Sequence, residues 1–310
     1  PHNQLCVLHE AEQQWVFDGI AQAPVPSLLR GFSAPVVLHV EYSQAKLLTL
    51  LAHDSDPFNQ WEAGQRLATR AALSAIEGQA PAGPILPPEV VQAFGQVLQN
   101  PQLDPAFIEL VLTLPSETYL AEQLSVVDPL RIHQVRQAMR MQLARELQPI
   151  WEQVYATHRT RGTFSISVQA MGQRALANLA LQHLCLSAVG NPESDWPDQA
   201  LHAFSRATNM TDRMGALQAL VHAQHPHADQ ALSQFHQLFV HDELVIDKWF
   251  ALQASAPDQD GSVLAQVKQL MRHPDFQLRN PNRARSLIST FCQGNPAAFH
   301  RSDASGYVFW

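Results

Sequence analysis

Histidine is the first residue type here that could do chemistry, because imidazole titrates near neutral pH and binds metals. Five of the 15 histidines crowd between residues 222 and 241: His222, His225, His227, His236 and His241. Zinc on a helix needs ligands three or four residues apart and a third from elsewhere, whereas Pro226 splits this group. The His9-Glu10 pair is followed by Gln13 where an H-E-x-x-H motif requires histidine. This spacing favours solvated or capping histidines over a metal site.

Cysteine and serine give no nucleophile pattern. Cys6, Cys185 and Cys292 are far apart and include no C-x-x-C pair, which excludes a disulfide framework and a zinc knuckle. Cys185 lies between two leucines and Cys292 follows a phenylalanine, so both are predicted to be inert buried thiols. G-x-S-x-G, G-x-G-x-x-G and Walker motifs are all absent. The sequence therefore predicts neither catalytic residues nor metal ligands in this chain.

Arginine offers a better candidate in the segment 280–287, which contains Arg283 and Arg285. Helix positions two apart differ by about 200° of rotation, so both side chains cannot enter one cleft. An arginine near a helix N-terminus opposes the helix dipole, which is tolerated when its guanidinium binds a carboxylate or carbonyl groups. We therefore expect one of the two to be structural, while a ligand-facing role stays open for the other. Asp247–Phe250 is similarly expected to be a helix with core-facing aromatic rings.

The elements that must position these residues differ before and after residue 42. Residues 1–41 show a period of two, with Trp15 and Phe17 in one run and Val36, Leu38 and Val40 in another. This pattern predicts two or three strands of a larger sheet. Two or three strands cannot close a sandwich, and the chain stops inside the apolar run 307–310. We therefore expect a piece of a longer protein.

Residues 42–310 show a helical period and form the second expected domain. Asp104, Asp128 and Asn280 each precede a proline and predict helix starts, while Pro115 predicts a break and Pro149 a kink. Residues 78–88, rich in proline and glycine, read as a surface loop. Short helices in antiparallel succession predict a mainly α fold, an irregular α-solenoid of HEAT-like stacked hairpins. The expected helices cover residues 43–53, 57–78, 88–99, 104–124, 128–158, 165–188, 196–207, 210–224, 228–240, 242–255, 261–272 and 281–293.

Composition excludes several classes of function. The net charge is -8, and lysine occurs only at Lys46, Lys248 and Lys268, so we expect no binding to nucleic acid or acidic membranes. No uncharged apolar stretch reaches the length of about 18 residues that a membrane span needs. The scattered cysteines fit a reducing compartment and predict a cytoplasmic location.

Five strings, in this order, resemble the bacterial aminopeptidase N family, the alanyl aminopeptidases among the gluzincin zinc metallopeptidases. They are Pro24–Val36, Asn209–Asp212, Asp247–Phe250, Asn280–Leu287, and Asn295–His300 followed by Ser305–Tyr307. The resemblance covers almost the whole chain. It implies that residues 1–41 end the family's small β-sandwich and that residues 42–310 form most of its C-terminal helical domain, which encloses the active-site chamber and controls substrate access.

The resemblance also implies where the chemistry lies. The family's zinc ligands, H-E-x-x-H glutamate and amine-recognition loop belong to an upstream catalytic domain of the same polypeptide, so this chain alone should hold no zinc and no catalytic residue. Its partners would be that domain and peptide substrates. The second arginine of the family's N-P-N-R-x-R motif lines the substrate cavity, and here it is Arg285. The alternative from another class is a free-standing helical-repeat module that binds peptides or proteins.

Overall fold

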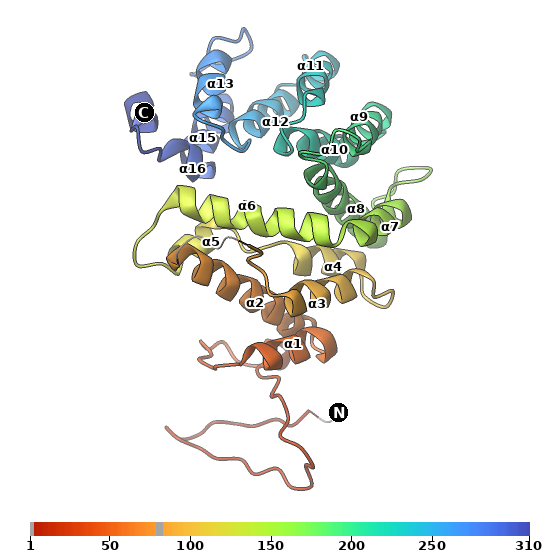
Figure 1. Cartoon of the computed structure of the whole chain (residues 1–310), viewed down its shortest axis with the longest axis vertical. Helices are drawn as coiled ribbons and strands as arrows, with labels where there is room; N and C mark the ends of the chain where they lie inside the picture. The colour runs from red at the N-terminus through yellow and green to blue at the C-terminus, as the bar shows by residue number, and fades with distance from the viewer. Residues whose placement is uncertain (1–2, 79–82) are drawn as a thin grey trace.

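The computed structural model describes residues 3–78 and 83–310 (Figure 1). From residue 44 onward its regular elements are helices, as the sequence predicted. Of the expected loop at residues 78–88, positions 79–82 lie outside the described residues, and residues 83–87 form no helix or strand. None of the described helices combines the length and the low polarity that crossing a bilayer requires.

Most of the helices follow one another with short connections, and longer ones join α7 to α8 and α13 to α14. Their bounds are η1 (Arg30–Phe32), α1 (Gln44–His53), α2 (Pro57–Glu77), α3 (Pro88–Leu98), α4 (Pro105–Leu112), α5 (Glu117–Glu122), α6 (Pro129–Glu146), α7 (Gln148–His158), α8 (Val168–Ser187), α9 (Trp196–Arg206), α10 (Met210–His222), α11 (His227–Phe239), α12 (Glu243–Ala254), α13 (Ser262–Leu270), α14 (Pro281–Ala284), η2 (Arg285–Ser289), α15 (Thr290–Gly294), α16 (Pro296–Phe299) and α17 (Ser305–Phe309).

Neighbouring helices pack as pairs and the array curves back on itself. α1 packs on α2, α7 on α8, and α9 on α10, while α8 also contacts α4, α6 and α10. In Figure 1, α6 separates the layer that contains α2–α5 from the helices that follow α7. The late helix α16 returns to contact α6, about 150 residues earlier in the chain by number. The result is an irregular curved stack of helical hairpins, as expected.

Local signals set most helix starts. The side chains of Asp104, Asp128 and Asn280 each accept a hydrogen bond from a first-turn amide, so all three predicted caps are confirmed. Pro115 lies between α4 and α5, also as predicted. Pro149 differs from the expected kink, because the helix is interrupted at Leu147 and Pro149 occupies the first turn of α7. Proline lacks the amide donor that a continuous helix needs there, but it is well suited to a first turn.

Residues 3–41 differ from the expected strands. They contain no β-ladder within the described residues, and Leu5 and Val37 are each 82% exposed. Extended segments become strands only when a neighbouring strand takes up their backbone hydrogen bonds. Figure 1 shows the segment looping away from α1 with no such neighbour. The Arg30–Asp54 ion pair, 2.5 Å between Nη1 and Oδ1, ties its last part to the helices.

Candidate functional site

Arg283 is the structural member of the arginine pair. Its backbone amide donates to the Asn280 side chain, 3.3 Å away, which places it in the first turn of α14. Its Nε lies 2.6 Å from Oδ1 of Asp247 on α12, and its guanidinium carbon lies 5.0 Å from the centre of the Phe250 ring. It also donates to the backbone carbonyl of Asp275. With its side chain 5% exposed, Arg283 locks α14 against α12 and cannot meet a ligand.

Arg285 has the opposite environment. It is exposed, and its guanidinium has no ion-pair or hydrogen-bond partner among residues 3–78 and 83–310. It begins the π-helical turn η2, where the Thr290 amide donates to its carbonyl five residues back. Such turns are frequent at functional sites. The expected division into one structural and one open arginine is confirmed, whereas a cavity-lining role for Arg285 stays a prediction.

The Asp247–Phe250 segment is helical as expected, with both aromatic residues buried. Trp249 is 5.0 Å from the ring of His236 and 5.3 Å from that of His273, measured between ring centres. The helix therefore presents aromatic surface to two histidines from separate elements.

These two histidines meet Asp275, a trio that the sequence analysis missed because 37 residues separate its first two members. Oδ2 of Asp275 lies 2.6 Å from Nε2 of His236 and 3.7 Å from Nδ1 of His273. The three groups are close enough to hold a metal ion. However, Nδ1 of His273 already accepts a hydrogen bond from the Asp275 amide at 3.2 Å. The trio is therefore a hydrogen-bonded network. It also holds the Asp275 segment, whose backbone carbonyl accepts a hydrogen bond from Arg283.

The other crowded histidines do not share a site. Nε2 of His227 lies 2.6 Å from Oδ1 of Asp198, and its ring packs on His225. His241 is exposed at the start of another loop, and His222, in the last turn of α10, is partly buried. Within the described residues, the histidines of the 222–241 group therefore lie in separate surroundings.

Cys185 is buried as predicted. Its exposure is 1%, and burial raises the pKa of its thiol to about 12. Because the thiolate is the nucleophilic form, this cysteine is unreactive at neutral pH. Burial also raises the pKa of Cys292.

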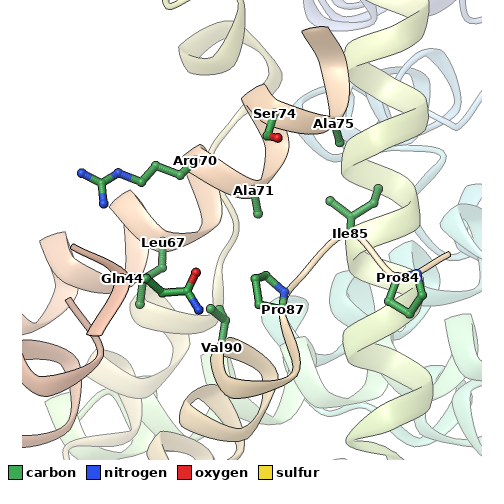
Figure 2. A pocket seen from close by; sticks show the side chains of 10 residues that line it. All are labelled: Gln44, Leu67, Arg70, Ala71, Ser74, Ala75, Pro84, Ile85, Pro87 and Val90. Atoms are coloured by element: carbon green, nitrogen blue, oxygen red, sulfur yellow. The ribbon is translucent and has the colours of Figure 1, made fainter. Parts of the chain in front are cut away.

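Cavities add two further candidates. A cavity of about 420 Å³ lies between α2 and the start of α3, and Figure 2 shows aliphatic and proline side chains lining it, with the Arg70 guanidinium extending away. It offers no reactive pair. A larger cavity of about 1030 Å³ lies among α7–α10 and is lined by both charge signs, with Arg159, Arg161, Arg206, Asp195, Asp198 and Asp212. Sequence reasoning did not find it, because the lining residues come from separate helices.

Known proteins resemble this chain over nearly its whole length. A family model described as a domain of unknown function with ARM repeats matches residues 44–310, and one described as a domain of unknown function with an Ig-like fold matches residues 1–41. Aminopeptidase N of Escherichia coli is 38% identical over 100% of this chain, and that of Caulobacter vibrioides is 37% identical over 99%. The chain spans 35% and 34% of these two proteins.

A solved structure supports the same relationship. Legionella pneumophila aminopeptidase A, crystallised in complex with aspartic acid, superimposes with a TM-score of 0.80 and 29% identity, covering 94% of this chain and 34% of its own. The resemblance to aminopeptidase N inferred from five short strings is thus confirmed, and the chain matches the helical domain of these enzymes.

Proposed function

Because this chain belongs to the family of ARM-repeat domains matched by its residues 44–310, we propose that it serves as the helical C-terminal domain of a zinc aminopeptidase. The supporting observation is the similarity to aminopeptidase N, which extends over nearly all of this chain. The chain spans about a third of the length of those relatives. An upstream catalytic domain of the same polypeptide would then hold the zinc and cleave N-terminal residues from peptides. We also propose a boundary near residue 42, supported by the two family matches at 1–41 and 44–310.

The proposed role is to enclose the active-site chamber and control which substrates enter. Its support is the curved stack in which α16 returns to α6, together with the exposed Arg285. Zinc bound in the catalytic domain would polarise the scissile carbonyl and activate water. This chain would confine the peptide, and the Arg285 guanidinium would hold a peptide carboxylate through paired hydrogen bonds.

The net charge and the cysteines support the proposed substrates and cellular location. Peptides are the expected substrates, and the net charge of -8 argues against nucleic acid. A cytoplasmic location is supported by three free cysteines, of which Cys185 and Cys292 are buried singly.

The test compares the full-length protein that contains this chain with the 310-residue chain alone. Zinc content is measured by mass spectrometry, and activity by release of a chromophore from an alanyl anilide. We expect stoichiometric zinc and turnover in the full-length protein and neither in the isolated chain. Turnover by the isolated chain, or a full-length protein with no aminopeptidase activity, would overturn the proposal.

A further inference from the structure

A cavity of about 370 Å³ lies where α4, α6, α8 and α10 meet, away from Arg283 and Arg285. Arg136 and Arg140, one turn apart on α6, line one side of it. His183 of α8 and His222 in the last turn of α10 line it as well. Three helices distant in sequence, α6, α8 and α10, therefore bring two guanidinium groups and two imidazole rings to one pocket, and α4 forms part of its wall.

The two arginines leave donors available. Arg136 is anchored by its Nε, which donates to the Pro115 carbonyl at 2.8 Å. Arg140 donates to Oε1 of Gln137 at 3.1 Å, and among the described residues it has no carboxylate partner. Burial and the neighbouring Arg136 lower the pKa of Arg140 to about 10, so it still carries its charge at neutral pH. Arg140 is partly buried and has one neutral partner, so its remaining guanidinium donors could bind an anion.

Nearby carboxylates do not form ion pairs with Arg136 or Arg140 among the described residues. Glu117 is engaged by His133, with 2.7 Å between Oε1 and Nδ1. Glu109 lines the cavity, but its Oε1 already accepts from the Thr113 hydroxyl at 3.2 Å, and in the described part of the chain no ion pair joins it to either arginine. An anionic ligand would therefore meet two positive groups whose charge the protein leaves largely uncompensated.

His183 supplies an acceptor instead of a further donor. Nδ1 of His183 bonds to the Leu179 carbonyl at 2.9 Å, which requires the proton on Nδ1 and leaves Nε2 as an acceptor. That Nε2 atom is buried with no hydrogen-bond partner among the described residues, and so is Nε2 of His222. Burial, reinforced by Arg140, lowers the pKa of both rings to about 3, so both are neutral at pH 7. A ligand that satisfies this cavity must both accept and donate hydrogen bonds.

We propose that this cavity is a binding site for hydrogen phosphate, whose charged oxygens accept from Arg136 and Arg140 while its retained O–H donates to an imidazole nitrogen. Inorganic phosphate keeps at least one O–H at pH 7. Sulfate has the same shape and charge but no O–H, so it would leave the His183 acceptor unpaired. A phosphate monoester, largely dianionic at pH 7, lacks the O–H too. The cavity should therefore select phosphate over both.

Isothermal titration calorimetry on the 310-residue chain, at pH 7 and constant ionic strength, tests this selection. We expect saturable binding of one inorganic phosphate per chain, with sulfate and methyl phosphate bound at least about tenfold more weakly. Absence of saturable phosphate binding, or equal affinity for phosphate and sulfate, would overturn the proposal. Because no catalytic domain is present in this assay, its failure would not bear on the aminopeptidase proposal.

Variants separate the two halves of the site. Arg140→Gln should weaken phosphate binding at least about tenfold, whereas Arg145→Gln, on the same helix but outside the cavity lining, should bind as the parent does. His183→Leu should keep anion binding but reduce the preference for phosphate over sulfate. Circular dichroism establishes that each variant is folded. Equal weakening by Arg140→Gln and Arg145→Gln, or an unchanged preference in His183→Leu, would contradict the assignment.

Discussion

The Arg283 guanidinium and the Asp247 carboxylate form a buried ion pair, 2.6 Å between Nε and Oδ1, that joins α14 to α12. This ion pair stabilises α14, a helix of only four residues that has an arginine in its first turn. The aspartate opposes the unfavourable interaction of that arginine with the helix dipole. The same pair turns Arg283 inward and leaves Arg285 outside.

Asp247→Asn should therefore destabilise the chain by about 3 kcal/mol, because removing one partner of a buried pair leaves an uncompensated charge. Urea unfolding followed by circular dichroism measures the change. Lys248→Gln is the matched control, since the adjacent Lys248 is exposed and pairs with no described residue, and it should change stability by less than about 0.5 kcal/mol. Similar losses of stability in Asp247→Asn and Lys248→Gln would contradict a stabilising role for the ion pair.

His183 should make the fold acid-sensitive. Burial lowers its pKa from the ordinary 6.5 to about 3, so between these values the unfolded chain binds more protons than the folded one. The stabilisation is complete above pH 6.5 and declines as the pH falls towards 3, by about 2 kcal/mol at pH 5. His183→Phe retains an aromatic ring against Trp151, which stacks on His183 at 4.2 Å between ring centres. This variant should lose less stability between pH 7 and pH 5 than the parent. An identical decline in both proteins would exclude His183 as the source.

At Gly172, the backbone of α8 passes close to the start of α4. A Cβ atom there would lie 2.9 Å from the Ala106 backbone nitrogen, so Gly172→Ala should push the two helices apart and cost about 1–3 kcal/mol. At Gly64 in α2 the nearest atom would be the Val111 side chain at 3.4 Å, an ordinary contact. Gly64→Ala should therefore be neutral or stabilising by up to about 1 kcal/mol. Thermal unfolding compares them, and a reversed order would contradict the packing argument.

Arg285→Ala tests the proposed chamber role in the full-length aminopeptidase. Removing the guanidinium should lower kcat/KM for peptides with a free C-terminal carboxylate by about tenfold, and for small anilide substrates much less. C-terminally amidated peptides provide the control substrates, since they lack the charge that Arg285 would hold. Equal losses for free and amidated peptides would contradict the assignment.

Local chemistry is what sequence reasoning captured well. Helix caps at Asp104, Asp128 and Asn280 depend on atoms within three residues, so their geometry is written in short strings. The opposite orientation of Arg283 and Arg285 follows from helical rotation alone. Strand formation in residues 3–41 depends on a partner strand, which their own alternation of apolar residues does not provide.

Non-local chemistry was decided by the tertiary structure. Which of the two arginines is buried depended on Asp247, thirty-six residues earlier by number and brought to it by the packing of α12. Arg140, His183 and His222 show no mutual spacing in the sequence, because they lie on three helices whose packing places them around one cavity. The sequence by itself determines helical periodicity and caps, because these depend on residues a few positions apart. The burial of a side chain and the pairing of its charge depend on which distant elements pack against it.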